Sequence, residues 1–461
     1  MNYFDAVAHR RLLREYPLRA GFTDDVARRP REELRALQNQ RFLRVLRRAW
    51  QVPFYRRRWT EAGVRPRDVR SLDDVSRLPA YTKVDLMRSI EAAPPFGDYH
   101  GMDGAPGLPV VVQTTSGTTG QPQPLFYGPR SREMQNLLLA RAYYFQGLRD
   151  ADRVHSVYGH GMVNGGHYVR ETFLHFTGAL FFSAGTGAET RSRTQVELMR
   201  RFGATVIVGF VDYVRHLAEV AREMGLDPRR DLGIRMISGH LGRESRESLS
   251  HAWGGAQVFD WYGVGDTGVI AAEGPDQQGL YVMEDAHHVD LVDPDAHTVV
   301  PDGDIGNVCV TVLFKDDIFP VVRFDTNDLS AFEPTPSPLE LGLRRLRGFL
   351  GRSDNMVKLR GINVYPTAVG ELLQAQPETT GEFLCRVERI QGRDEMTVLI
   401  ETRAPAERHL DIAGDYRALF RRKLGVEVGV ELTGPGALIS LTGIESRQKP
   451  ARLQDLRASS D

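Results

Sequence analysis

The sequence has few cysteines, few lysines and no long apolar run. Its only cysteines, Cys309 and Cys385, lie far apart in apolar stretches. This pattern argues against a disulfide scaffold and a multi-cysteine zinc site, and it favours buried thiols in a reducing compartment. No run approaches the ~18 apolar residues that cross a bilayer, and the amino terminus has no apolar signal core. We therefore expect a cytoplasmic protein with no membrane partner.

Net charge also narrows the possible partners. The formal net charge of the 461 residues is −1 at pH 7, so the chain has no general electrostatic attraction to nucleic acid. A small molecule is the expected partner. The only lysines are Lys83, Lys315, Lys358, Lys423 and Lys449. Each of them is of interest, because arginine cannot replace a compact ammonium group everywhere.

Alternating apolar patterns predict an α/β fold. An amphipathic helix is expected within residues 31–50. After residue 130, helices are expected over 131–147, 196–202 and 212–224, and strands over 154–158, 205–209 and 234–238. Such alternation implies parallel strands covered by helices. Residues 279–314 are richer in turns and predict antiparallel hairpins, hence a β-rich subdomain within the large unit.

A second, smaller domain is predicted after a proline-rich loop at residues 333–338 and a hydrophobic helix over 339–346. We place the boundary between residues 1–351 and residues 352–461. In the smaller part, strands over 383–390 and 396–402 flank a turn at Gly392 and Arg393. A helix over 406–424 and a strand over 426–432 complete a small α+β unit.

The segment TTSGTTG, from Thr114 to Gly120, follows an apolar run and indicates a phosphate-binding loop. Glycines allow backbone N–H groups to turn toward an anion, and hydroxyls add donors without bulk. An ordinary polar turn is the alternative. A P-loop of the usual kind is not compatible, since Gln121 follows Gly120 and the chain contains no Gly-Lys pair.

Four later motifs accompany this loop. They are FDWYGVGD at 259–266, RFDTND at 323–328, GRSDNMVKLRG at 351–361 and RQK at 447–449. In this order the set resembles the adenylate-forming superfamily of acyl-CoA synthetases, peptide-synthetase adenylation domains and luciferases. The likeness is greatest to phenylacetate-CoA ligases, and it covers nearly the whole chain.

The resemblance implies a large core domain and a small mobile domain that rotates on a hinge. It implies a reaction in two halves, in which a carboxylic acid and Mg²⁺-ATP give an acyl-adenylate, and a thiol such as that of CoA then displaces AMP. Relatives often form homodimers. Most of the chemistry is then positioning and charge neutralisation.

The resemblance also assigns the nucleotide site. Asp328 matches the carboxylate that accepts the ribose hydroxyls, Tyr262 the ring that packs on adenine, and Asp260 the group that meets the adenine amine. Asp354 matches the hinge. The residues implied for nucleotide binding are Thr115, Ser116, Gly117, Thr118, Thr119, Gly120, Gly239, Asp260, Trp261, Tyr262, Gly263, Asp328 and Arg352.

Three residues carry the implied catalytic roles. Lys449 matches the lysine that bridges the attacking carboxylate and the α-phosphate. Asp266 stands where a glutamate usually helps to hold Mg²⁺. Lys358 occupies a position used by some relatives in thiol transfer, and a simple surface lysine is the alternative for it.

The resemblance also implies an acyl pocket, formed by residues that match segments lining the carboxylate site in relatives. Their mixture of aromatic and polar side chains favours an aryl acid bearing a hydroxyl or amino group. The members of this pocket are Tyr158, His160, Val163, Asn164, Phe210, Asp212, Tyr213 and Gly265. The alternative is a glycine-rich loop over 159–166 in which His160 has only a structural hydrogen bond.

Some residues depart from the family pattern. Gln121 replaces a common lysine, Asp266 a glutamate, and Ser238-Gly-His-Leu241 the usual Gly-Gly-Glu-Pro. These departures leave other functions open: transfer to a carrier-protein thiol, transfer to an amine or hydroxyl, or a degenerate nucleotide-binding homologue without catalysis. The joint presence of Asp328, Arg352, Asp354 and Lys449 argues against the last.

Overall fold

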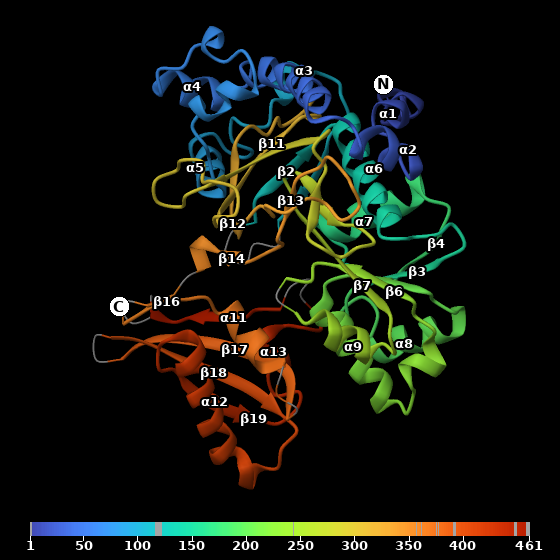
Figure 1. Cartoon of the computed structure of the whole chain (residues 1–461), viewed down its shortest axis with the longest axis vertical. Coiled ribbons are helices and arrows are strands. Elements are labelled where there is room, and N and C mark those ends of the chain that lie inside the picture. The colour runs from blue at the N-terminus through green and yellow to red at the C-terminus, as the bar shows by residue number, and fades with distance from the viewer. Residues whose placement is uncertain are drawn as a thin grey trace. The chain divides into compact units, whose positions relative to one another are not determined.

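A computed structural model describes residues 2–115, 122–242, 244–355, 357–360, 362–374, 376, 378–390, 393–446 and 450–457. It contains two compact units (Figure 1). The first unit comprises Met1–Ser156, His160–Ser183 and Phe259–Leu350, and the second comprises Val157–Gly159, Ala184–Val258 and Gly351–Asp461. The mixed α/β class predicted from the sequence is confirmed. The predicted domain boundary between residues 351 and 352 and the predicted hinge at Asp354 stay predictions.

Helices make up the amino-terminal part of the first unit. The longest of them, α3 (Arg31–Ala49), occupies the segment in which the sequence predicted an amphipathic helix, and it buries Leu34, Phe42 and Leu46. The others are η1 (Phe4–Ala6), α1 (His9–Glu15), α2 (Ala20–Phe22), η2 (Thr23–Ala27), α4 (Pro53–Glu61), η3 (Pro66–Asp68), η4 (Leu72–Arg77), α5 (Lys83–Ala92) and η5 (Met102–Gly104). In the described part of the chain, no helix is long and apolar enough to cross a bilayer.

Antiparallel strands form the β-rich part of the first unit, as predicted. In one sheet, β11 (Gly306–Val312) pairs with β10 (His287–Val292) and with β12 (Phe324–Ser330). In another, β8 (Gly268–Glu273) pairs with β7 (Gln257–Val264) and β9 (Leu280–Val282), and β9 pairs with β13 (Arg345–Leu346). The short hairpin of β1 (Val111–Thr114) and β2 (Pro124–Tyr127) flanks the glycine-rich loop.

Parallel strands and helices occur in both units. In the first unit, β3 (Arg153–Ser156) pairs in parallel with β4 (Leu180–Ser183). The helix α6 (Pro129–Phe145) packs against α7 (Asn164–Phe176) and β8 (Figure 1). In the second unit, β5 (Val206–Val208) and β6 (Met236–Gly239) are parallel, and α8 (Ser192–Phe202), α9 (Val211–Glu223), η6 (Pro228–Leu232) and α10 (Arg246–Ala252) accompany them.

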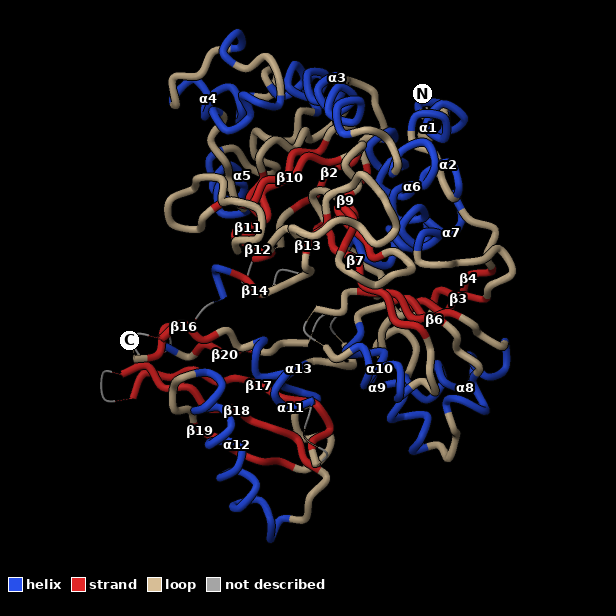
Figure 2. The backbone as a smooth tube through the Cα atoms, viewed as in Figure 1, coloured by secondary structure: helices blue, strands red, loops and turns tan. Residues whose placement is uncertain are grey.

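The segment after residue 350 forms the small α+β structure that was predicted. Its central hairpin joins β17 (Thr379–Ile390) and β18 (Arg393–Thr402), which pair in parallel with β20 (Leu453–Asp455) and β19 (Gly429–Thr433). Figure 2 shows these strands with their helices. The remaining elements are β14 (Gly351–Arg352), η7 (Ser353–Asn355), β15 (Val357–Leu359), β16 (Ile362–Val364), α11 (Thr367–Gln374), η8 (Ala406–Arg408), α12 (His409–Leu424) and α13 (Ile439–Thr442). The predicted turn residue Gly392 lies outside the described residues.

The predicted helix over residues 339–346 is wrong. Residues 345 and 346 form strand β13, and Glu340 has a φ of 54°, which no regular right-handed helix allows. The Arg345 guanidinium group donates to the backbone carbonyl groups of Thr335 and Pro336. The segment is therefore held by side chain to backbone hydrogen bonds, which apolar periodicity does not reveal.

A buried charge cluster joins α3, α6 and the chain before β10. The fully buried Asp285 lies 2.8 Å from the Arg141 guanidinium group and 3.6 Å from that of Arg41. Burial alone would raise the pKa of the Asp285 carboxyl, but the two arginines lower it below its ordinary value. The carboxylate is thus needed to keep two buried cations paired.

We predict that Asp285→Asn destabilises the first unit by about 3 to 5 kcal/mol, since it leaves two buried guanidinium groups without their counter-charge. Denaturant unfolding followed by tryptophan fluorescence measures the change. Asp293→Asn is the control, because Asp293 is only partly buried and caps a turn through the backbone amides of Asp295 and Ala296. Equal stability of the two variants would contradict the assigned role of Asp285.

Candidate active site

The glycine-rich loop leaves and returns at paired positions of the β1–β2 hairpin. Thr114 pairs with Pro124, and the next residue, Thr115, forms two hydrogen bonds with Gln123 at the base of the loop. Its backbone N–H donates to the Gln123 carbonyl group at 3.0 Å, and its hydroxyl accepts from the Gln123 N–H at 3.1 Å. The hairpin therefore closes a loop whose predicted phosphate-binding residues Ser116, Gly117, Thr118, Thr119 and Gly120 lie outside the described residues.

A tyrosine and a carboxylate form the centre of the predicted nucleoside site. The Tyr262 hydroxyl, at the end of β7, donates to Asp328 Oδ2 on β12 at 2.8 Å. It also contacts the Thr326 hydroxyl at 3.1 Å, which in turn accepts from the Asp328 backbone N–H. Asp328 is only 6% exposed. The structure thus brings together the two residues that the sequence placed on the adenine and on the ribose.

The backbone around Tyr262 requires glycine. A β-bulge interrupts the β7–β8 ladder between Tyr262 and Gly263, and a Cβ at Gly263 would overlap the Gly268 carbonyl group. A Cβ at Gly265 would overlap Leu125. Asp260 is held on the same strand, because its backbone N–H donates to Glu273 at 2.7 Å. Trp261 is buried beside it.

A buried polar cluster surrounds the predicted metal ligand Asp266. The Gln123 side-chain amide donates to Asp266 Oδ1 at 2.7 Å, and the Lys315 ammonium group donates to the Asp266 backbone carbonyl group at 3.1 Å. Lys315 is fully buried, with its Nζ 4.2 Å from the ring centre of Phe319. This arrangement places a cation and an amide where the sequence alone indicated only a carboxylate.

Burial dominates the titration of this pair. It raises the pKa of the Asp266 carboxyl, although Gln123 and Lys315 oppose the change. It lowers the pKa of Lys315 to about 8, although Asp266 and Asp317 oppose that change. A cation that enters the cluster would therefore favour the charged form of Asp266, and an anion would favour the charged form of Lys315.

The predicted acyl residues of the first unit are tied to neighbouring groups. The His160 Nε2 lies 2.8 Å from the Ser183 hydroxyl. Val163 forms an isolated β-bridge with Thr114, next to the base of the glycine-rich loop. Asn164 begins α7, is 7% exposed and accepts from Arg132 at 2.5 Å. Asn164 and His160 thus each have a local hydrogen-bond partner, and their predicted roles in the acyl pocket stay predictions.

In the second unit, three rings gather near the start of α9. Tyr158 and Phe210 meet edge to face at 5.1 Å, and Phe210 stacks on His240 at 5.1 Å with an interplanar angle of 19°. The Tyr213 hydroxyl contacts the Ser192 hydroxyl at 2.8 Å. The Asp212 carboxylate accepts from Arg452 at 2.5 Å.

The other predicted residues of the second unit have separate positions. Gly239 ends β6, and a Cβ there would overlap the Gly209 carbonyl group, so only glycine fits. Arg352 and Asp354 form a bidentate ion pair with distances of 2.7 and 2.6 Å. Lys358 lies in β15. Lys449 lies outside the described residues.

Sequence reasoning missed Gln123 and Lys315. The role of Gln123 as a donor to Asp266 depends on a contact between residues 143 positions apart, which the sequence pattern does not reveal. A signal for Lys315 was present, because a lone lysine within an apolar stretch of an arginine-rich chain needs a counter-charge when buried.

Comparisons with known proteins identify the family of the chain. The AMP-binding enzyme family matches residues 67–312, and the AMP-binding enzyme C-terminal domain matches residues 361–457. The chain is 29% identical over 437 residues to phenylacetate-coenzyme A ligase of Aromatoleum evansii, covering 92% of this chain and 95% of that protein. It is 30% identical over 427 residues to the enzyme of the same name from Pseudomonas putida, covering 88% and 92%.

A solved structure supports the same family assignment. The crystal structure of 2-hydroxyisobutyryl-CoA ligase in the postadenylation state, in complex with R3-HIB-AMP, matches with a TM-score of 0.82 and 26% identity, covering 94% of this chain and 92% of that one. The chain therefore belongs to the AMP-binding enzyme family and is an adenylate-forming, AMP-producing acid–CoA ligase that uses ATP and CoA.

We predict that Tyr262→Phe weakens AMP binding about 10-fold, because loss of a hydrogen bond to a buried carboxylate costs roughly 1.5 kcal/mol. Isothermal titration of AMP measures the effect. The control is Tyr281→Phe in β9 of the same unit. It removes a hydroxyl that contacts Asp276 and Ser337, and we expect it to leave AMP affinity unchanged. Unchanged affinity for Tyr262→Phe would show that the hydroxyl does not organise the ribose site.

Proposed function

We propose that the chain activates an aromatic carboxylic acid, hydroxy- or amino-substituted, as its acyl-adenylate and transfers the acyl group to CoA. The observation that carries the aromatic assignment is the cluster of Tyr158, Phe210 and His240. Aromatic rings gain from edge-to-face and stacked contacts beyond simple burial. The relatives named as phenylacetate-coenzyme A ligases support the same class of acid.

In the first half-reaction, an oxygen of the substrate carboxylate attacks the α-phosphorus of ATP. The bond from that phosphorus to the bridging oxygen breaks, and pyrophosphate leaves. We assign the ribose hydroxyls to Asp328, held by Tyr262, and the β- and γ-phosphates to the loop closed by Thr115. Arg352 is assigned to the ribose and Lys449 to the charge that develops between the carboxylate and the α-phosphate.

The metal assignment depends on oxygen ligands near the phosphates. The Asp266 carboxylate and the buried Gln123 Oε1, which has no hydrogen-bond partner in the described structure, are hard oxygen donors of the kind Mg²⁺ prefers. These residues fit the ion and would hold it. When bound, Mg²⁺ neutralises charge on the phosphate oxygens.

In the second half-reaction, the CoA thiol gives up its proton, and its sulfur attacks the acyl carbonyl carbon. The bond to the AMP oxygen then breaks and leaves AMP and a thioester. We assign Asp354 to the hinge between the two halves and Lys358 to the thiol-transfer arrangement. To distinguish the possible acceptors, the same acyl-adenylate is offered to CoA, to a carrier-protein thiol and to an amine, and its consumption by each is measured.

A panel of acids tests the aromatic assignment. We expect kcat/KM for hydroxy- or amino-substituted aryl acids to exceed that for 2-hydroxyisobutyrate at least about 10-fold, with AMP and aryl-CoA identified by mass spectrometry. Phe210→Leu lowers kcat/KM roughly 2- to 10-fold for aryl acids only, which is the value of an aromatic pair. A preference for the aliphatic acid would reassign the substrate.

Substitution of Lys449 is expected to affect the two half-reactions differently. We expect Lys449→Ala to lower ATP–pyrophosphate exchange ~10²- to 10³-fold, because loss of one charge donor at a developing anion costs about 2.7 to 4 kcal/mol. Transfer to CoA from a supplied acyl-adenylate stays near the wild-type rate. Lys423→Ala, in the last turn of α12, is the control and leaves both rates unchanged. Equal losses in both assays would contradict the role given to Lys449.

A further inference from the structure

One face of α9 is charged and contacts the segment after residue 350 within the second unit. Asp212, Arg215, His216 and Glu219 recur at the i, i+3, i+4, i+7 spacing of a single helical face. The other face buries Val214, Leu217 and Ala221 in the core of the same unit. The polar face is therefore the side that remains for contacts with the carboxyl-terminal segment.

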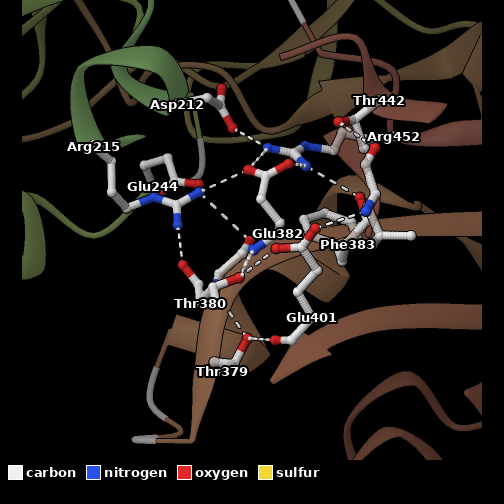
Figure 3. A network of polar contacts seen from close by, with 12 residues as sticks. Asp212, Arg215, Glu244, Thr379, Thr380, Glu382, Phe383, Glu401, Thr442 and Arg452 are labelled. Atoms are coloured by element: carbon white, nitrogen blue, oxygen red, sulfur yellow. Dashed lines mark hydrogen bonds and ion pairs between the residues drawn. The ribbon is translucent and has the colours of Figure 1, made fainter. Parts of the chain in front are cut away.

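Arg452 makes the most extensive of these contacts (Figure 3). Its guanidinium group donates to Asp212 at 2.5 Å and to both oxygens of Glu382 at 2.9 and 3.1 Å. It also donates to the Phe383 carbonyl group at 3.1 Å and lies 4.8 Å from the Phe383 ring centre. A planar fork with five donors suits this arrangement, and an ammonium group does not. Arg452 thus links α9 to β17.

Arg215 extends the same network from the helix side. It donates to the Thr380 carbonyl group at 2.6 Å and lies 3.3 Å from Glu382 and 3.5 Å from Glu244. Gly381 makes this approach possible, because it has a φ of 87° and a Cβ there would overlap the Arg215 guanidinium group. The backbone of β17 is therefore shaped to receive a side chain from α9.

A second anchor lies on the other side of residues 447–449. Glu445 accepts from Ser192 on α8 at 2.7 Å and lies 2.6 Å from His216 Nε2 on α9. Its neighbour Ile444 is 2% exposed within the core cluster that contains α8 and α9. Lys449 thus lies in the sequence between two residues, Glu445 and Arg452, that are both bound to α9.

We propose that Arg452 is a positioning residue for the first half-reaction. Its ion pair with Asp212, together with the contact of Glu445 with His216, anchors both ends of the sequence segment in which Lys449 lies. This inference rests on the proposed function of Lys449. Paired charges suit a reversible contact, since each group regains water when the contact opens, whereas an exposed apolar face would not be tolerated in solution. Asp212 is then a partner of Arg452 rather than a ligand of the acid.

The test compares the half-reactions in the full-length protein. We expect Arg452→Gln to lower kcat of ATP–pyrophosphate exchange ~10- to 100-fold, with KM for ATP nearly unchanged, which is the usual range of coupling between linked elements. Transfer from supplied acyl-adenylate to CoA stays within about 2-fold of wild type, because it does not use this arrangement. Arg452→Lys keeps the charge and restores part of the exchange rate.

Two further variants keep the test decisive. Arg457→Gln is the matched control: Arg457 also pairs with two carboxylates, Asp455 and Asp394, but within the carboxyl-terminal segment, so exchange stays unchanged. Asp212→Asn also lowers the rate of ATP–pyrophosphate exchange, and the fold-decrease is the same for every acid tested. The exchange rate of the double variant Asp212→Asn, Arg452→Gln is little lower than that of either single variant.

The results that would contradict the positioning role of Arg452 differ from the result that would contradict the proposed function. Equal loss of exchange and of thiol transfer in Arg452→Gln, or additive losses in the double variant, would overturn the positioning role. A change in the ranking of acids in Asp212→Asn would also overturn it, because it would make Asp212 a substrate ligand. Absence of exchange in the wild-type protein with every acid would instead contradict the proposed function itself.

Discussion

A buried carboxylate stays charged only where donors surround it, and this constraint organises the molecule. Asp285 is held by Arg141 and Arg41, Asp328 by Tyr262, Asp266 by Gln123, and Asp212 by Arg452. Hydrogen bonds from groups far away in the sequence offset the desolvation of Asp285 and of the partly buried Asp212, whose carboxyl pKa values are lowered, and they offset that of Asp266 only in part. Fold, nucleotide site and contacts of α9 therefore depend on one kind of interaction.

This constraint explains why the proposed nucleotide site has its polar groups already paired and oriented. Tyr262 and Thr326 orient Asp328, and the hairpin bonds between Thr115 and Gln123 close the loop while Gln123 reaches Asp266. Donors already in place need no reorganisation when charge develops in the reaction. The aspartate at position 266 is compatible with this, because the Gln123 side-chain amide reaches its carboxylate.

Much of this could be predicted, for physical reasons that differ by element. Periodicity located α3, α8, α9 and β5, and turn-rich alternation located the antiparallel sheets, because both patterns report local burial. The family resemblance assigned Tyr262 and Asp328 to one nucleotide site, but it did not predict the hydrogen bond between them. The segment 339–346, Lys315 and the role of Arg452 could not be predicted, because their partners, such as Pro336, Asp266 and Asp212, are set by tertiary contacts.

The central claim is that these prearranged groups direct an oxygen of the acid onto the α-phosphorus of ATP. Turnover with CoA and an acid labelled with oxygen-18 in its carboxylate tests this most directly, by mass spectrometry of the phosphorylated products. The account predicts one labelled oxygen in AMP and none in pyrophosphate. Labelled inorganic phosphate formed together with ADP would contradict it, because the acid would then have attacked the terminal phosphorus.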